Sequence, residues 1–379
     1  MLVVVIWHVT EVWPGYVALT DSTTDALEWA LASVRWSLAL FFLMAGFFGA
    51  HLLRRWGTAR FARDRLRRIG IPLVVGVIAI VPLAEPILHA VKPELDPAPV
   101  PAHLWFLWYV LVLYVVAIVL LRAPWIDRVS AATARLVASP LAVPLLAALT
   151  AVLLFGGRFL SVGDASWLVP KPQMLGFYGA FFVVGVLLHG TPEGVDAVGR
   201  RPWLTGAIAL AALVPLVLLD PESVWEGSAV LSPGRSRGWL VLVCLFTWAA
   251  VFCVCGVGKR LFSAERPAVR YIADASYWIF LMHFPFVPLA ITAAISLGQP
   301  FPVAWSVALT LLFSFLLITY ELFVRHTFIG RTLNGPRPPR GWGLAGRRPA
   351  TEGVRAQPLT AGSHSPTAAA TAGRSDLSE

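Results

Sequence analysis

Long apolar stretches separated by short charged segments make up most of this chain. A helix that crosses a lipid bilayer needs about 20 mostly apolar residues, and the sequence contains nine stretches of roughly that length. They are Ser37–Leu53, Ile69–Leu88, Ala102–Leu121, Pro140–Gly157, Gln173–His189, Trp203–Leu219, Trp239–Val257, Ile272–Leu297 and Pro302–Val324. The pattern predicts an all-α, polytopic membrane protein built as a helical bundle.

A tenth apolar segment opens the chain but stops at Pro14-Gly15. At about 1.5 Å per residue, the thirteen residues before this break reach only about 20 Å of a hydrocarbon core that is roughly 30 Å thick. We therefore expect about ten transmembrane helices, of which the first is clipped. Either translation starts upstream of Met1 or this helix is only partly inserted.

The composition excludes a soluble protein. Hydrophobic residues make up 58% of the chain and charged residues 13%, whereas soluble proteins carry about 25% charged residues. The net charge is +9, and the basic residues that cause it lie between apolar segments, as in membrane-flanking loops. We therefore expect a lipid bilayer as partner and no nucleic acid. The three cysteines fall within one apolar run, which predicts neither a disulfide framework nor a metal site. No P-loop, dinucleotide fingerprint or zinc-protease motif occurs, and we expect no permanently bound cofactor.

Lysines and arginines predict the orientation. The loops at 53–69, 121–140, 189–203 and 257–272 together carry sixteen of them, against six on the opposite side. Cationic loops remain cytoplasmic, so we expect a multi-pass plasma-membrane protein whose C-terminal tail is cytoplasmic. Residues 1–333 form the predicted membrane domain, and residues 334–379, rich in Pro, Gly, Ala, Ser and Arg, form a predicted disordered tail.

Ionisable side chains within the apolar segments are candidate functional residues, because each costs at least about 2.5–3.5 kcal/mol at the bilayer centre. His8 and Glu11 share a helix face, where the carboxylate can orient the imidazole. His283 and Glu321 each follow a serine by seven positions, which predicts two inward-facing polar stripes. For His283 a packing role is an equal alternative. We interpret the remaining histidines near predicted interfaces as unremarkable: His51, His103, His189 and His326.

The densest cationic run is Arg54–Arg68. Within it, Arg65 and Arg68 lie three positions apart, so two guanidinium groups share one helix face at the membrane surface. Such a pair suits bidentate recognition of phosphate. The alternative is an anchor for anionic lipid headgroups.

Six short segments, in order along the chain, resemble the motifs of the membrane-bound acyltransferase 3 family and of its branch related to the glucan succinyltransferase OpgC. They are Leu2-Val3-Val4-Val5-Ile6-Trp7-His8, Phe41-Phe42-Leu43-Met44-Ala45-Gly46-Phe47-Phe48, Arg65-Leu66-Arg67-Arg68, His103-Leu104-Trp105-Phe106-Leu107, Ser276-Tyr277-Trp278-Ile279-Phe280-Leu281-Met282-His283 and Tyr320-Glu321-Leu322. Ala45 replaces the family's usual serine, and Phe280 replaces its second tyrosine. The basic residue that the family carries eleven positions before the first histidine has no counterpart, because only seven residues precede His8.

The resemblance implies an O-acyltransferase that moves an acyl group, acetyl or succinyl, from cytoplasmic acyl-CoA to a hydroxyl of a cell-envelope carbohydrate or another acceptor. It implies that Arg65 and Arg68 bind the donor phosphates and that His8, oriented by Glu11, is the general base or the nucleophile.

We assign Tyr277, His283 and Glu321 to the acceptor channel or to stabilisation of the tetrahedral oxyanion. The alternative function is a transporter that exports a polysaccharide or an acylated metabolite, since histidines and glutamates within the membrane also suit a proton-coupled path.

Overall fold

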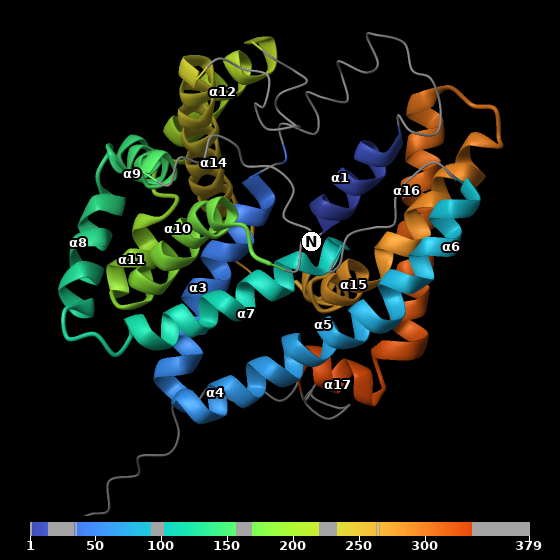
Figure 1. Ribbon diagram of the computed structural model, residues 1–379, viewed down its shortest axis with the longest axis horizontal. Coiled ribbons are helices and arrows are strands. Elements are labelled where there is room, and N and C mark those ends of the chain that lie inside the picture. Colours follow the sequence, from blue (N-terminus) through green and yellow to red (C-terminus); the bar gives the residue numbers. More distant parts are fainter. Residues whose placement is uncertain are drawn as a thin grey trace, which may run out of the picture. The chain divides into compact units, whose positions relative to one another are not determined.

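The computed structural model describes residues 2–13, 34, 36–91, 102–156, 169–219, 233–262, 264 and 266–335. All regular secondary structure in these ranges is helical, as predicted (Figure 1). The α-helices are α1 (Leu2–Val12), α3 (Trp36–Trp56), α4 (Thr58–Arg65), α5 (Ile71–Val75), α6 (Val81–Val91), α7 (Trp105–Leu120), α8 (Ile126–Ala138), α9 (Ala142–Gly156), α10 (Pro172–His189), α11 (Pro192–Ala197), α12 (Pro202–Leu219), α14 (Pro233–Leu261), α15 (Pro267–Ile295), α16 (Phe301–Thr319) and α17 (Phe328–Asn334). They are joined or extended by π-helical turns at Leu66–Gly70, Gly76–Ile80 and Tyr320–Val324 and by a 3-10 turn at Ala102–Leu104.

Seven helical segments within the described ranges are long and apolar enough to cross a membrane. These are Trp36–Trp56, Thr58–Ala84, Ala102–Leu120, Pro172–His189, Arg237–Leu261, Pro267–Ile295 and Phe301–Val324. Two further apolar helices, Ala142–Leu154 and Pro202–Leu216, are shorter, and α1 has 11 residues. Every predicted apolar segment is therefore helical where it is described, but the expected number of about ten spans is not confirmed.

The arginine-rich segment at 53–69, which we predicted as a cytoplasmic loop with a shared helix face only at Arg65 and Arg68, is helical on both sides of Gly57. Helix α3 is followed by Gly57, which has a φ of 76°. Glycine is favoured in this conformation just after the end of a helix. From Thr58 the chain is continuously helical to Val91 through α4, α5, α6 and two π-helical turns, and Figure 1 shows this run rising from α4 at the bottom of the view to α6 at the right. The arginines therefore have helical spacing on a defined surface.

Glycines allow α3 and α10 to pack backbone against backbone. A Cβ atom at Gly46 would lie 2.0 Å from the carbonyl oxygen of Phe182, and one at Gly185 would lie 2.1 Å from that of Leu43. Small residues at helix crossings are typical of membrane bundles, where close packing replaces the hydrophobic effect. This contact fixes α3 beside α10.

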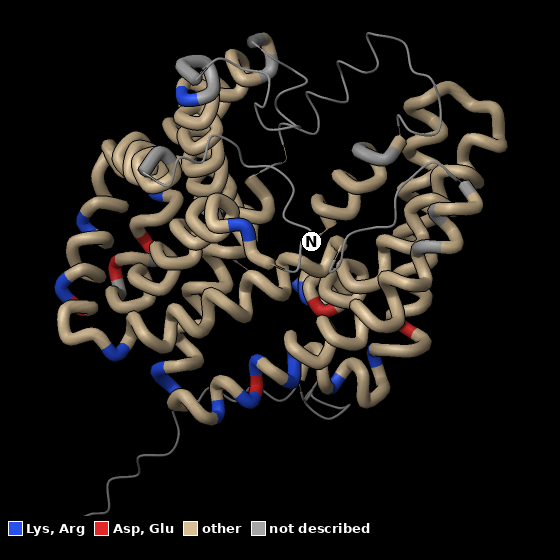
Figure 2. Tube along the Cα trace, viewed as in Figure 1, with Lys and Arg blue, Asp and Glu red and all other residues tan. Residues whose placement is uncertain are grey.

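The ends of helices that carry the predicted cytoplasmic loops contact one another. Arg54 at the end of α3 pairs with Asp127 of α8 at 3.4 Å, and Lys259 at the end of α14 pairs with Asp196 of α11 at 3.4 Å. Figure 2 shows Lys and Arg gathered along α4 and α8. These two ion pairs join the predicted cytoplasmic loops two by two, 53–69 with 121–140 and 257–272 with 189–203.

Candidate functional site

Helix α1 is packed into the bundle and directs His8 towards α15. The indole N–H of Trp305, on α16, donates a hydrogen bond to the Thr10 hydroxyl at 3.1 Å, and Trp13 meets Phe301 edge-on with ring centroids 5.4 Å apart. These contacts set the rotation of α1. The His8 ring, which is partly buried, consequently lies 5.1 Å from the ring of His283.

His283 is fully buried in the middle of α15. Its Nδ1–H donates to the carbonyl oxygen of Phe280 at 2.7 Å. A carbonyl can only accept, so in the neutral ring the hydrogen is on Nδ1 and Nε2 is a bare acceptor. This Nε2 is buried and has no hydrogen-bond partner among the described residues.

His103 joins the same cluster from the turn that precedes α7. It is 4% exposed, and its ring lies 5.1 Å from the His283 ring. Its Nε2–H donates to the carbonyl oxygen of Leu281 at 3.1 Å. Pro285 lies four positions after Leu281 within α15 and has no amide hydrogen, so it leaves this carbonyl without its usual helical partner. The imidazole of His103 takes that place.

The hydrogen bond to Leu281 also fixes the tautomer of the neutral His103 ring. With the hydrogen on Nε2, the ring has a bare Nδ1, which is buried and has no hydrogen-bond partner in the part of the chain that the structure describes. An unsatisfied buried polar atom costs about 1–3 kcal/mol.

The residue before His103, Ala102, has a φ of 51°, a left-handed conformation that is uncommon for a residue with a side chain. Strained backbone of this kind is frequent at functional sites.

The three-histidine cluster, formed by His8, His103 and His283, was only partly predicted. The sequence indicated His8 and His283 as candidates. We interpreted His103 as an unremarkable histidine near the membrane interface, because it lies at the start of an apolar run. Within the described residues, no group of three His, Cys, Asp or Glu side chains has the arrangement of a metal site. Glu11, the predicted partner of His8, belongs to α1, but its side chain lies outside the described residues.

The predicted donor-binding arginines lie together on one helical surface. Asp64 pairs with both, forming a hydrogen bond to the guanidinium of Arg65 and one of 2.9 Å to that of Arg68. The Arg65 guanidinium also lies over the rings of Phe61 and Tyr114, at 5.6 and 5.7 Å from the centroids. Only 16% of the Arg65 side chain and 27% of the Arg68 side chain are exposed. Asp64 therefore pre-orients both guanidinium groups, a role that its i,i+4 spacing from Arg68 could have indicated.

Tyr277 connects this surface to α15. Its hydroxyl donates a hydrogen bond to the backbone carbonyl of Arg68 at 2.8 Å. Arg68 belongs to a π-helical turn, and such turns are frequent at functional sites. Six residues separate Tyr277 from His283 along α15, a helical rise of about 9 Å. The guanidinium pair and the histidine cluster are thus neighbouring parts of one region.

Beside the arginines is a pocket of about 320 Å³, lined by Arg65, Arg68, Tyr277 and Phe106 among others. The Phe106 ring lies 6.0 Å from that of Phe280, which in turn lies 5.9 Å from the His103 ring. Aromatic rings therefore separate this pocket, which we call the arginine pocket, from the histidine cluster.

Glu321 lies elsewhere. Its carboxylate accepts hydrogen bonds from Arg325 at 2.7 and 2.8 Å and from the Tyr271 hydroxyl at 3.3 Å. Tyr271 and His283 are twelve residues apart on α15, about 18 Å of helical rise. Ser314, which we expected to share an inward-facing stripe with Glu321, is exposed, so that interpretation was wrong. The structure does not bring Glu321 to the histidine cluster.

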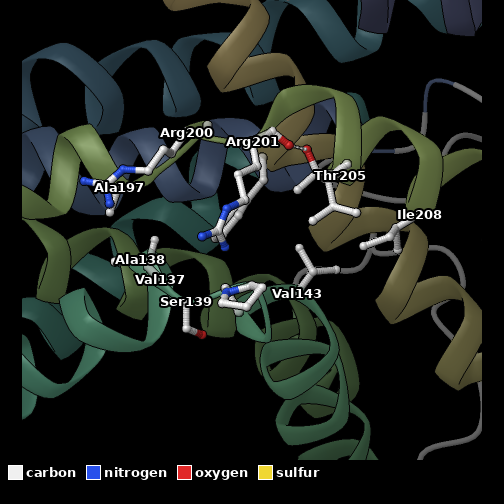
Figure 3. A pocket seen from close by; sticks show the side chains of 14 residues that line it. Val137, Ala138, Ser139, Val143, Ala197, Arg200, Arg201, Thr205 and Ile208 are labelled. Carbon is white, nitrogen blue, oxygen red and sulfur yellow. Dashed lines mark hydrogen bonds between the residues drawn. The ribbon is translucent and has the colours of Figure 1, made fainter.

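A second cationic pocket lies beside Arg200 and Arg201. Figure 3 shows the guanidinium group of Arg201 projecting into it, while Arg200 turns towards Ala197. Its volume is about 20 Å³, enough for about one water molecule and too small for a phosphate group. The two cationic pockets therefore differ in size by more than tenfold.

Comparison with known proteins identifies the family. A model of the acyltransferase 3 family, described as an acyltransferase domain, matches residues 1–320. Relatives include the glucans biosynthesis protein C of Salmonella heidelberg (strain SL476), 24% identical, and that of Salmonella agona (strain SL483), 23% identical; each comparison covers 88% of this chain and 88% of the relative. No solved structure matches significantly. The match spans most of the chain, including the histidine cluster and the arginine pocket, and the chain therefore belongs to the acyltransferase 3 family of membrane acyltransferases.

Proposed function

We propose that this protein transfers an acyl group from cytoplasmic acyl-CoA to a hydroxyl group of a cell-envelope glycan. The observation that carries the proposal is the proximity of two sites with complementary chemistry. One is a pocket with two oriented guanidinium groups. The other is a buried cluster of imidazoles, in which His283 lies about 9 Å of helical rise along α15 from Tyr277 of the pocket lining.

The arginine pocket suits a donor that carries phosphate groups. Arg65 and Arg68 offer planar forks of N–H donors, which bind phosphate oxygens in pairs. Both are largely shielded from water, so an ion pair with phosphate is screened less than at an open surface. The apolar part of the lining, including Phe106, suits the uncharged arm and acyl group. Tyr277, bound to the backbone of Arg68, supports this donor pocket in our proposal.

His8 would act on the acceptor. As general base, its imidazole takes the hydroxyl proton while the oxygen attacks the thioester carbonyl. The carbon–sulfur bond then breaks, and the proton passes to the departing thiolate, which leaves as the coenzyme thiol. In the alternative, His8 attacks the thioester carbonyl first, the carbon–sulfur bond breaks and the coenzyme thiol leaves, and the acceptor hydroxyl then takes the acyl group from the acyl-histidine, which frees the imidazole. Both routes need this ring to face the acceptor.

The hydrogen bonds of His283 favour one of its two predicted roles. A developing oxyanion needs hydrogen-bond donors, whereas the uncommitted Nε2 of His283 has no hydrogen. It suits contact with a hydroxyl of the acceptor. Glu321 accepts hydrogen bonds from Arg325 and from Tyr271 of α15. These partners support a role of Glu321 in joining the end of α16 to α15 rather than in the acceptor channel.

The glycan acceptor is inferred from relatives named for glucan biosynthesis, and acetyl and succinyl are both candidate acyl groups. The test is to incubate purified protein in lipid nanodiscs with labelled acetyl-CoA or succinyl-CoA and a glucan oligosaccharide. We expect acylated oligosaccharide and free coenzyme. His8→Ala should abolish the product, while His189→Ala, which changes a histidine outside the cluster next to His51, should not.

Retention of acylated product by the His8→Ala protein at normal abundance would remove His8 from the chemistry. A wild-type protein that consumes neither donor, yet moves labelled oligosaccharide across proteoliposomes, would replace the proposal with the transporter alternative. Mass spectrometry of envelope glycans from cells with and without the gene would identify the acyl group and its acceptor.

A further inference from the structure

Two adjacent imidazole rings, those of His103 and His283, each have a bare nitrogen, and the His283 ring lies next to that of His8. Nδ1 of His103 and Nε2 of His283 are buried, lack hydrogen in the neutral rings, and have no hydrogen-bond partner among the residues that the structure describes. Their rings are 5.1 Å apart. Native proteins satisfy nearly all buried polar atoms, so two unsatisfied acceptors on adjacent rings call for a cause.

Packing does not supply that cause. Hydrophobic residues of similar size would fill the same space without the cost of an unsatisfied nitrogen. The hydrogen bond from His103 to Leu281 satisfies the carbonyl that Pro285 leaves free, but it uses only one of the two ring nitrogens. The other nitrogen gains a partner only from a molecule that brings hydrogen-bond donors.

We propose that His103 belongs to the acyl-acceptor site, and that its Nδ1 and the Nε2 of His283 accept hydrogen bonds from two hydroxyl groups of one acceptor molecule. The inference rests on the proposed function and adds to it the atoms that bind the acceptor. Two hydroxyls of one sugar ring, in addition to the hydroxyl that is acylated, are held by the two imidazoles. The hydroxyl that is acylated faces His8, whose ring is 5.1 Å from that of His283.

An acceptor has to displace a side chain to reach these nitrogens, because both are covered. Phe284 stacks on the His103 ring at 4.8 Å and lies edge-on to the His8 ring at 6.3 Å. Phe284 is only partly buried, so it is one neighbour of the cluster with room to move. Hydrogen bonds at active sites often form only once the substrate is bound.

The test compares acceptors and variants in the full-length protein. The probes are methyl β-glucoside and its 2-, 3- and 4-deoxy derivatives, and binding is measured without donor, from the shift of the thermal unfolding midpoint, as well as by acyl transfer. For the wild-type protein, we expect at least one deoxy derivative to bind roughly five- to tenfold more weakly, the usual effect of one lost hydrogen bond.

His103→Phe keeps a flat ring but removes both nitrogens. We expect it to raise the KM for the glucoside about tenfold or more while the KM for acyl-CoA is unchanged. His103→Gln, which restores one donor and one acceptor, should recover part of the affinity. The matched control is His189→Phe, since His189 also lies 5.1 Å from another histidine, His51, but outside the cluster.

Glucoside affinity of His103→Phe equal to that of wild type and His189→Phe would overturn the inference. Equal binding of the glucoside and all three deoxy derivatives by wild type would do the same, and this comparison decides the matter if His103→Phe fails to fold. If wild type binds the glucoside through His103 but consumes no acyl-CoA, the inference stands and the proposed function fails.

Discussion

Removing one guanidinium group from the arginine pocket is the most direct test of donor binding. The variants are Arg65→Ala and Arg68→Ala, made singly. In each, the remaining arginine still pairs with Asp64, because that carboxylate is bound by both side chains. Neither variant therefore leaves an unpaired buried charge, and each is expected to fold.

The expected magnitude follows from burial and bond type. A hydrogen bond to a charged group contributes about 1.5–3 kcal/mol, which corresponds to about 10- to 150-fold in affinity. The side chains are only 16% and 27% exposed, so solvent screening reduces this contribution little. Part of it is offset, because Asp64 competes with phosphate for the same N–H groups. We expect the KM for acyl-CoA to rise about 10- to 50-fold in each variant, with a smaller change in kcat.

The assay is steady-state acyl transfer in nanodiscs at a fixed acceptor concentration, with acyl-CoA varied. The control, Arg54→Ala, removes the same charge from a solvent-exposed pair whose side chains are 39% and 82% exposed. Such pairs contribute about 0–1 kcal/mol, so its KM should stay within about threefold of wild type. If all three variants raise the KM equally, the arginines act only as a membrane anchor and the proposed donor pocket is wrong.

Three further predictions concern the parts that hold the site together. Tyr277→Phe removes the hydrogen bond to the backbone carbonyl of Arg68 and should raise the KM for acyl-CoA about two- to tenfold, which donor titration would measure; a KM equal to wild type would contradict it. Trp305→Phe removes the hydrogen bond to Thr10, which should weaken the packing of α1 and lower kcat several-fold while the KM for acyl-CoA stays constant. A fall in kcat together with a rise in the KM for acyl-CoA would indicate general misfolding instead. Gly46→Val places a side chain against the backbone of α10 and should lower the thermal midpoint of the detergent-solubilised protein by several degrees, a result that an unchanged midpoint would refute.

Sequence motifs indicated both halves of the proposed site, whereas the structure changes the interpretation of two residues, His103 and Glu321. His8 and the arginine pair were identifiable because an ionisable group in an apolar segment, or two cations with helical spacing, is unusual in itself. His103 was missed because an isolated histidine at the start of an apolar run has no distinguishing pattern. Its role depends on a carbonyl that Pro285 leaves free on another helix. Glu321 was assigned to the site because its spacing from Ser314 suggested an inward-facing polar stripe, but Ser314 is exposed.

The amino-acid sequence by itself determined that the described chain is helical, which segments are apolar enough to lie in a membrane, and which cations gather between them. Local periodicity and the absence of water in the hydrocarbon core are sufficient for these properties, because a helix satisfies its own backbone hydrogen bonds. Only the tertiary structure decided which side chains meet. The contact of His8 with His283 requires the packing of α1 on α15 and α16, and the contact of His103 with Leu281 joins residues 178 positions apart. Such contacts depend on helix rotation and crossing, which side-chain packing throughout the bundle sets together.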